Sequence, residues 1–318
     1  MEKKQHQLTL PGLALEDDQS DSDETSPFSS SSCKDAVYVL DTHYLMYQVF
    51  HALPDIRSPA GKPVAAIYGY VQDILQLMNR DDCGYLMCAF DTPLDASFRR
   101  KLYSAYKSNR EAMPEELSDQ VLSVRRMLTA MNVPALESAG YEADDVLATV
   151  ANMSYAKGLT CYLVTGDKDC RQLLKDRVFI YNHRKDLIFD AHELHRTWGI
   201  RPDQVVDFQA LVGDPVDNIP GVPLIGPKTA SQLLNQYESL DNLLAHATEV
   251  RGDSRRRNLI EGRESTQLAR DLVRLVEDVP IQLDWGSSRV GGMDQVRIQD
   301  LCDEFGLQRL SSRLAAFS

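Results

Sequence analysis

The pattern of apolar and polar residues predicts alternating strands and helices over residues 35–200. Short apolar runs rich in β-branched residues are typical of strands that are buried on both faces. Such runs lie at 36–40, 85–90, 133–136, 160–164 and 178–181. Between them, residues 64–78 and 117–131 have helical periodicity. Strands that alternate with helices predict an α/β fold with a parallel sheet.

The two ends of the chain differ from this pattern. From about residue 201 the strand signals stop and the chain becomes mostly helical, with a packed helix or two within 298–314. Residues 1–34 are polar, acidic and serine-rich, a composition that cannot bury enough apolar surface to order itself. We therefore expect a disordered tail over 1–34, an α/β domain over 35–200 and a helical region over 201–318.

Acidic residues stand at or just past the carboxyl end of one predicted strand after another. These ends meet along one edge of a parallel sheet, where binding crevices form. A single Asp at such a place is explained equally well as the N-cap of the next helix. Caps alone do not explain the whole set, which is Asp41, Asp91, Glu142, Asp144, Asp145, Asp167 and Asp169.

These carboxylates predict a site for divalent cations. Glu142, Asp144 and Asp145 crowd the start of one helix, and crowded carboxylates resist ionising together. Because no His or Cys accompanies the set, the ligands are hard oxygens, which suit Mg²⁺ or Mn²⁺ better than Zn²⁺. Asp214 and Asp217 would extend the set to nine, although turn formation in a Pro/Gly-rich loop explains them as well.

Two stretches are rich in basic residues. Residues 98–110 hold five bases, no acids and three aromatic residues, which fits a single-stranded nucleic-acid surface or, alternatively, an amphipathic surface helix. Arg251, Arg255, Arg256 and Arg257 form a second cluster, which is either a solvated loop or a set of extra phosphate contacts.

Residues 213–230 predict a helix–hairpin–helix, spanning about 207–237. Gly221 and Gly226 permit a tight turn, and Pro227 suits the first position of a helix. The free N–H groups at that helix start, together with Lys228, can bind a backbone phosphate of duplex DNA without reading its sequence. A P-loop is excluded because a residue separates Gly226 from Lys228 and no strand precedes the turn.

The net charge of −13 does not exclude a nucleic-acid partner. The tail carries −4 and the nine acids account for −9, so the rest of the chain is neutral overall.

No apolar run reaches the length of about 18 residues that a membrane span requires. No signal peptide is visible, and the six cysteines have no zinc-binding spacing, so we expect a reduced, cytoplasmic protein.

Several motifs in this order resemble those of a known family. They are Tyr-Glu-Ala-Asp-Asp at 141–145, Thr-Gly-Asp-Lys-Asp at 165–169 and Gly-Asp-x-x-Asp-Asn-Ile-Pro-Gly-Val-Pro at 213–223. Phe-Asp at 90–91, Phe-Arg at 98–99 and Tyr-Lys-x-x-Arg at 106–110 add to them. The chain resembles the 5′-nuclease domain of bacterial DNA polymerase I, within the flap endonuclease superfamily, over roughly residues 37–310.

The resemblance implies a PIN-like fold and a metal-dependent nuclease that acts on 5′ flaps, nicked or forked duplexes and 5′ ends of DNA in replication or repair. By position, the main metal site would be Asp41, Asp91, Glu142, Asp144 and Asp145. The second would be Asp167, Asp169, Asp214 and Asp217. Two ions would activate a water and stabilise the leaving oxygen.

The resemblance also implies the DNA contacts. Arg99 would steer the scissile phosphate, and a helical arch over about 92–115 would carry Tyr106, Lys107 and Arg110. Arg99 and Lys107 would add charge stabilisation in the transition state. The hairpin contacts would be Gly221, Val222, Ile225, Gly226, Lys228 and Thr229. In the family this hairpin often also holds K⁺.

The chain departs from the family at two positions. Thr42 stands where Gly is usual, and Gln48 stands where Arg is usual, which would weaken one phosphate contact. No polymerase domain follows, so we expect a stand-alone, monomeric nuclease whose polymerase partner, if any, is a separate protein. Two alternatives are a non-catalytic DNA-junction binder and a PIN-type ribonuclease, although PIN-type domains are shorter and lack residues 213–230.

Overall fold

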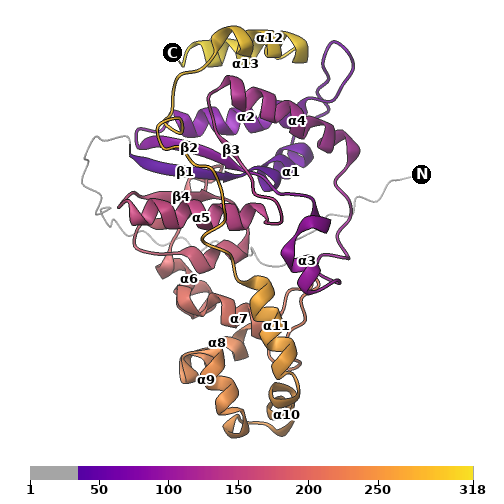
Figure 1. Cartoon of the computed structure of the whole chain (residues 1–318), viewed down its shortest axis with the longest axis vertical. Coiled ribbons are helices and arrows are strands. Elements are labelled where there is room, and N and C mark those ends of the chain that lie inside the picture. The colour runs from indigo at the N-terminus through magenta and orange to yellow at the C-terminus, as the bar shows by residue number, and fades with distance from the viewer. Residues whose placement is uncertain (1–34, 318) are drawn as a thin grey trace, which may run out of the picture. The chain divides into compact units, whose positions relative to one another are not determined.

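The computed structural model describes residues 35–317, so the tail expected over 1–34 lies outside the described residues. A six-stranded sheet has the order β3-β2-β1-β4-β5-β6 (Figure 1). Its strands are β1 (Ala36–Asp41), β2 (Cys83–Ala89), β3 (Ala135–Leu136), β4 (Cys161–Val164), β5 (Val178–Asn182) and β6 (Leu187–Phe189). All neighbouring strands are parallel except β5 and β6, which are antiparallel.

Helices cover both faces of the sheet and continue beyond it. The helices that follow the strands are α1 (Thr42–Ala52), α2 (Ala65–Met78), α3 (Phe98–Leu102), α4 (Glu115–Ala130), α5 (Ala143–Ala156) and α6 (Ala191–Trp198). The later helices are α7 (Val205–Val212), α8 (Pro227–Tyr237), α9 (Leu240–Ala245), α10 (Asp253–Glu261), α11 (Arg263–Val273), α12 (Gln295–Phe305) and α13 (Gln308–Ala315). Short 3₁₀ helices are η1 (Leu94–Ala96), η2 (Lys168–Leu173), η3 (Pro202–Gln204) and η4 (Ala247–Glu249).

The central strand β1 explains why the sheet is covered on both sides. All six of its residues are buried, and alternate side chains point to opposite faces. Val37 and Val39 pack in the same apolar cluster as α5, whereas Tyr38 and Leu40 pack with α1, α2 and α4. A strand that is apolar on both faces is stable only between two layers of helices. The predicted α/β sheet is confirmed, and the antiparallel pair of β5 and β6 is the one departure from the parallel strands that were expected.

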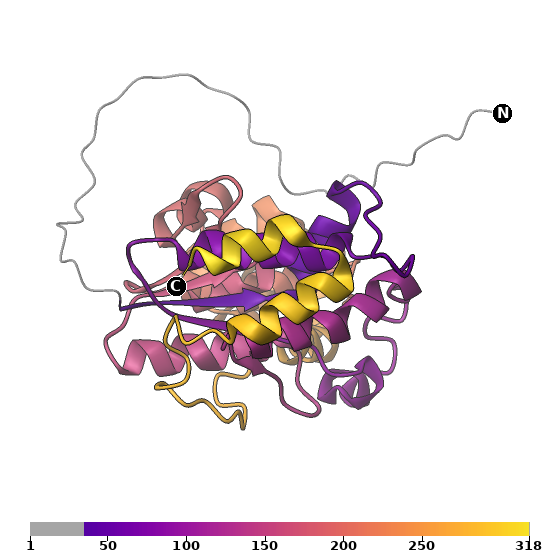
Figure 2. The same cartoon turned by 90° about the horizontal axis from the view of Figure 1, so that it is seen from above.

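The last two helices belong to the α/β layer, which departs from the helical region expected over 201–318. Residues 274–294 contain no helix and return along β2, where Leu86 N–H donates to Ser288 O (3.1 Å) and Val290 N–H donates to Gly84 O (3.1 Å). Helices α12 and α13 then pack on α4 and α2, as the yellow helices in Figures 1 and 2 show. Their apolar faces complete the core on that side.

Strand β6 was not predicted, because its three residues are largely exposed and carry no buried apolar pattern. None of the helices within residues 35–317 combines the length and the apolar character that a membrane-crossing helix needs.

The packing of α13 predicts a large stability loss when its core residue is truncated. Leu310 is fully buried, so Leu310→Ala should lower the free energy of unfolding by about 2–5 kcal/mol. The neighbouring Arg309 is exposed, so Arg309→Ala should change it by less than about 0.5 kcal/mol. Urea denaturation followed by circular dichroism measures both, and equal effects would mean that α13 is not part of the core.

Candidate active site

Three neighbouring strands bring carboxylates to one edge of the sheet. Asp41 ends β1, Asp91 lies two residues past β2, and Asp167 lies three residues past β4. Strands β2, β1 and β4 are adjacent and parallel, so their carboxyl ends meet in one crevice. The structure therefore brings these three predicted acids together.

Helix ends and a hydroxyl group fix the first two of these carboxylates. Asp41 is the N-cap of α1, where it accepts from the Tyr44 N–H (3.1 Å), and its other oxygen accepts from the Thr165 hydroxyl (3.0 Å). Asp91 accepts from the N–H of Ala143, the first residue of α5 (2.8 Å). Both carboxylates thus use N–H groups that a helix leaves free at its start.

Asp144 on α5 and Asp169 on η2 join the three acids at the strand ends. Asp167 is the N-cap of η2, where it accepts from the Asp169 N–H (2.8 Å). The Asp169 carboxylate accepts from the Gln209 amide on α7, and Asp144 on α5 lies 3.4 Å from the Cys170 thiol. The α/β layer and the helical segment that follows it thus hold the same group of acids.

Repulsion among these carboxylates is strong. Burial and the charges of Asp91 and Asp167 raise the pKa of Asp41 to about 7. Burial and the charges of Asp167 and Asp217 raise the pKa of Asp169 to about 8. Such shifts mean that ionising every carboxyl at neutral pH is costly unless positive charge enters the cluster. A divalent cation supplies that charge, and the all-oxygen donor set fits a hard ion.

Asp214 comes from the loop between α7 and α8. It is 4% exposed, exchanges backbone hydrogen bonds with Ile219 (2.8 Å each), and its carboxylate lies 3.1 Å from the Lys168 ammonium. Its charge contributes to the raised pKa of Asp169. Burial and the charge of Asp167 likewise raise the pKa of Asp144 well above its usual value. Asp144 and Asp214 therefore belong to the same electrostatic cluster.

Basic side chains balance part of the cluster. The Lys107 ammonium lies 2.5 Å from Glu142 Oε2 and 3.7 Å from Asp217 Oδ2, and Arg110 also pairs with Asp217. Within residues 35–317, no three His, Cys, Asp or Glu side chains are grouped so that they could hold a metal ion as they stand. The Lys107 ammonium and the Arg110 guanidinium thus offset part of the negative charge of Glu142 and Asp217.

Arg99 and Asp145 depart from the expected phosphate and metal contacts. Asp145 is fully buried and receives two hydrogen bonds of 2.7 Å from the Arg99 guanidinium. Arg99 is 2% exposed and also donates to the carbonyls of Leu272 (2.8 Å) and Arg274 (2.9 Å). The pair ties α3 and α5 to the end of α11. Neither side chain is therefore open to a phosphate or to a cation.

The segment expected to form a helical arch, residues 92–115, contains little helix and packs against the carboxylate cluster. Its only α-helix before Glu115 is the five-residue α3, and the Lys107 N–H donates to the Asp217 carbonyl (2.9 Å). Tyr106 is 3% exposed, and its hydroxyl donates to Glu142 (3.1 Å). Its ring is therefore buried here, in contrast to the expected DNA contact. Arg110 remains partly open to solvent.

Two glycines shape the predicted hairpin between α7 and α8. A Cβ on Gly221 would lie 2.1 Å from the Val212 carbonyl, so only glycine allows the chain to pass there. Gly226 is the N-cap of α8 and has open space around it. Lys228 is exposed and Thr229 is partly exposed in the first turn of α8. These residues leave the helix start accessible to a phosphate.

Val222 and Ile225 contribute to the hairpin differently from what was expected. Their exposures are 5% and 3%, and both pack in the apolar cluster of the helical segment. The Val222 N–H donates to the Leu211 carbonyl (2.8 Å) and the Ile225 N–H donates to the Val222 carbonyl (3.1 Å). Their side chains anchor the hairpin in the apolar core.

Sequence reasoning missed Tyr44 and the need for Gly166. A Cβ on Gly166 would lie 1.9 Å from the Tyr44 hydroxyl, so glycine in the Thr-Gly-Asp motif is a steric requirement. Gln48 donates to that hydroxyl. Thr42 is fully buried and shares a hydrogen bond with Tyr70 (2.9 Å). The two unusual residues, Thr42 and Gln48, thus have partners within the protein.

His43 and Lys168 were also missed. The His43 Nδ1 lies 3.1 Å from Asp91 Oδ2, and Lys168 pairs with Asp214. The sequence offered no signal for His43. The position of Lys168 inside the 165–169 motif was the only signal for that residue.

Comparison with known protein families identifies the family to which this chain belongs. A model described as "5'-3' exonuclease, N-terminal resolvase-like domain" matches residues 36–199. A second, described as "5'-3' exonuclease, C-terminal SAM fold", matches residues 200–296. The chain belongs to the 5′-3′ exonuclease family.

Individual relatives are of two lengths. The chain is 40% identical over 258 residues to DNA polymerase I of Rhizobium leguminosarum, which covers 79% of this chain and 25% of the relative. It is 37% identical to the thermostable DNA polymerase I of Thermus thermophilus, over 86% of this chain and 33% of the relative. It is 32% identical to a 5'-3' exonuclease of Aquifex aeolicus, over 86% of this chain and 93% of the relative. The chain thus spans a quarter to a third of the polymerases.

Solved structures share the fold. The T5 D15 protein co-crystallised with metal ions has a TM-score of 0.64 at 20% identity, over 89% of this chain and 99% of the other. The catalytic core of Rad2 in complex with DNA substrate has a TM-score of 0.60 at 15% identity, over 89% of this chain and 92% of the other.

Neighbouring acids on α5 should respond in opposite ways to removal of their charge. Asp145→Asn breaks the buried pair with Arg99 and should lower the free energy of unfolding by about 3–5 kcal/mol. Asp144→Asn removes a repelled charge, so in EDTA it should leave that free energy unchanged or raise it. Urea denaturation of both variants in EDTA measures this, and equal losses would contradict the division between the two acids.

The stability of the metal-free protein should fall as pH rises. The pKa values of Asp41 and Asp169, about 7 and about 8, exceed the value of about 4 that an unfolded Asp has. The folded state therefore holds more protons than the unfolded state between pH 4 and 8, so stability declines across that window.

Thermal unfolding in EDTA from pH 5 to pH 9, repeated with millimolar Mg²⁺, measures this dependence. We expect the melting temperature to fall in EDTA and to fall less with Mg²⁺. The double variant Asp41→Asn/Asp169→Asn should flatten the EDTA curve. A melting temperature that rises with pH in EDTA would be incompatible with the raised pKa values.

Proposed function

We propose that the chain is a structure-selective 5′-3′ exonuclease and 5′-flap endonuclease that hydrolyses DNA phosphodiesters with bound Mg²⁺ or Mn²⁺. The observation that best supports this function is the cluster of mutually repelling carboxylates at the sheet edge, next to the hairpin between α7 and α8. Membership of the 5′-3′ exonuclease family and the DNA and metal complexes of similar folds support it.

The carboxylates divide into two ligand groups. One ion would be held by Asp41, Asp91, Glu142 and Asp144, and a second by Asp167, Asp169, Asp214 and Asp217. Asp145 is left out because Arg99 occupies both of its oxygens. When bound, such ions lower the pKa of an attacking water and stabilise the leaving oxygen.

The basic residues of the site would then change partners. Lys107, Arg110 and Lys168 balance Glu142, Asp217 and Asp214 in this structure. Cations bound by those acids would free the three bases for the DNA phosphates. Lys107 pairs with an acid of each group, Glu142 and Asp217, so it is the residue placed to stabilise negative charge that develops on the scissile phosphate.

The hairpin would hold the duplex by its backbone. The free N–H groups at the start of α8 and the Lys228 ammonium suit a phosphate and carry no sequence information. The K⁺ ion that the resemblance implies would share this phosphate. Substrates of this class are 5′ flaps, nicked or forked duplexes and 5′ ends. We assign the chain to the cytoplasm and propose that it acts as a monomer.

Loss of one metal-ligating acid should abolish cleavage without abolishing binding. The substrate is a fluorescently labelled 5′-flap duplex with Mg²⁺, with EDTA as the metal-free control. Asp167→Asn should lower the cleavage rate at least about a thousandfold and leave the Kd for DNA within a few-fold. The matched control Asp300→Asn changes an exposed acid on α12 and should cleave like wild type.

Three other results would point elsewhere. Cleavage by Asp167→Asn within a few-fold of wild type would remove this acid from the site. Binding without cleavage in both Mg²⁺ and Mn²⁺ would favour a non-catalytic junction binder. Preferential cleavage of an RNA hairpin over the DNA flap would favour a PIN-type ribonuclease.

A further inference from the structure

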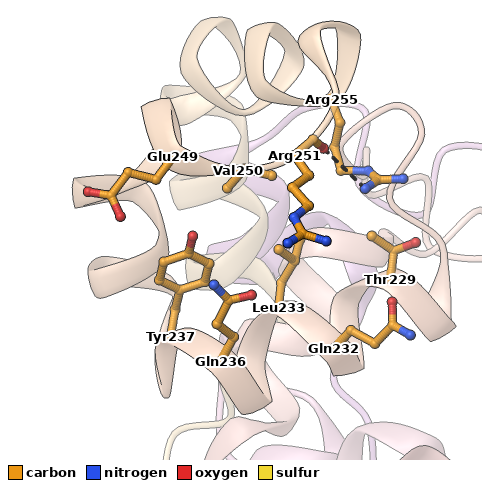
Figure 3. A pocket seen from close by; sticks show the side chains of 9 residues that line it. All are labelled: Thr229, Gln232, Leu233, Gln236, Tyr237, Glu249, Val250, Arg251 and Arg255. Carbon is orange, nitrogen blue, oxygen red and sulfur yellow. Dashed lines mark hydrogen bonds between the residues drawn. The ribbon is translucent and has the colours of Figure 1, made fainter.

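A polar cavity of about 260 Å³ lies outside the carboxylate cluster, between α8 and the segment that joins η4 to α10 (Figure 3). Side chains from α8 line one side, and residues 249–255 line the other. The polar side chains around it are Thr229, Gln232, Gln236, Glu249, Arg251 and Arg255. Neither the carboxylate cluster nor the hairpin turn accounts for this cavity.

The two arginines of the cavity are not satisfied by the protein. The Arg255 Nε is buried and has no hydrogen-bond acceptor, while its terminal nitrogen donates only to the Arg251 carbonyl (3.3 Å). Arg251 is exposed, and no residue within 35–317 forms an ion pair or hydrogen bond with its guanidinium. A buried guanidinium N–H without an acceptor is costly, so these groups favour an acceptor from outside the chain.

A neighbouring arginine shows the contrast. Arg256 pairs with Asp253 and approaches the carbonyls of Thr248 and Val250 at 3.5 Å. The basic cluster at 251–257 is therefore divided. Arg256 stabilises the local fold, whereas the Arg255 Nε and the Arg251 guanidinium have no acceptor among the described residues.

The rest of the lining adds donors and little negative charge. Thr229, Gln232 and Gln236 carry hydroxyl and amide groups on the α8 side, and Arg251 extends across the cavity toward that helix in Figure 3. Glu249 is the one acid of the lining, and its carboxylate points away from both arginines in the same view. Guanidinium groups with hydroxyl and amide donors suit a phosphate oxygen.

The cavity adjoins the hairpin. Thr229 lies in the first turn of α8, one residue from Lys228, so the same helix serves the hairpin and the cavity. On the other side, the Asn258 amide of α10 donates to the Pro223 carbonyl in the hairpin (2.8 Å). A duplex held at the start of α8 would therefore pass the mouth of the cavity.

We propose that this cavity binds a second backbone phosphate of the duplex that the hairpin holds, with Arg251 and Arg255 as its main donors. The inference rests on the proposed function, because it assumes a duplex at the hairpin. The second phosphate would fix the angle of the duplex over the carboxylate cluster, which a single phosphate contact does not.

Duplex binding by the full-length protein in EDTA tests the proposal. Fluorescence anisotropy with a labelled blunt duplex gives the Kd at several salt concentrations. Arg251→Ala should raise the Kd about tenfold and lower the slope of log Kd against log salt by roughly one. Because the Arg251 guanidinium has no hydrogen-bond or ion-pair partner among the described residues, the melting temperature of Arg251→Ala should equal that of wild type. Arg257→Ala, an exposed arginine on α10 outside the cavity lining, should change the Kd less than about twofold.

The outcomes separate this inference from the function it rests on. If wild type binds no duplex, the proposed function itself fails. If wild type binds and Arg251→Ala binds equally well, or Arg257→Ala loses as much, the cavity is not a phosphate site for DNA. A thermal-shift titration with inorganic phosphate tests whether the cavity binds a free anion instead. Saturable thermal protection by phosphate that depends on Arg251, with an unchanged duplex Kd, would make this a site for a free anion and overturn the proposal.

Discussion

Repulsion among buried carboxylates is the constraint on which the site depends. The sheet places Asp41, Asp91 and Asp167 at adjacent strand ends, and the helices and loop that follow add more acids to the same crevice. Desolvation and mutual repulsion raise the pKa values of Asp41 and Asp169 to about 7 and about 8. In this structure Lys107, Arg110 and Lys168 supply part of the compensating charge. Divalent cations would supply it more strongly and, at the same time, bring the chemistry that phosphodiester hydrolysis requires.

The start of α5 shows how acids next to each other in sequence acquire separate tasks. Asp144 faces the cluster, whereas Asp145 points into the protein and is neutralised by Arg99. That pair also binds the carbonyls at the end of α11, so it joins the sheet to the helical segment that carries the hairpin. The geometry of the site relative to the hairpin therefore depends on this buried ion pair.

The sequence predicted most of the sheet and the meeting of the acids, because both follow from local patterns and from parallel strand topology. The expected strand at 36–40 and helix at 64–78 match β1 and α2 closely. It did not predict that Arg99 and Tyr106 are buried or that α13 packs on the α/β layer, because these depend on tertiary partners far along the chain. Val222 and Ile225 were assigned to ligand contacts from a motif, yet their apolar side chains are needed in the core.

Counting bound metal ions tests the central claim most directly. Titration of the metal-free protein with Mn²⁺ at pH 8, followed by electron paramagnetic resonance, measures how many ions the chain takes up and how tightly. Two ions per wild-type chain are predicted, with one or both lost in Asp167→Asn and neither lost in Asp300→Asn. Uptake of less than one ion at millimolar Mn²⁺, or equal uptake by wild type and Asp167→Asn, would contradict the account that this cluster is a metal site.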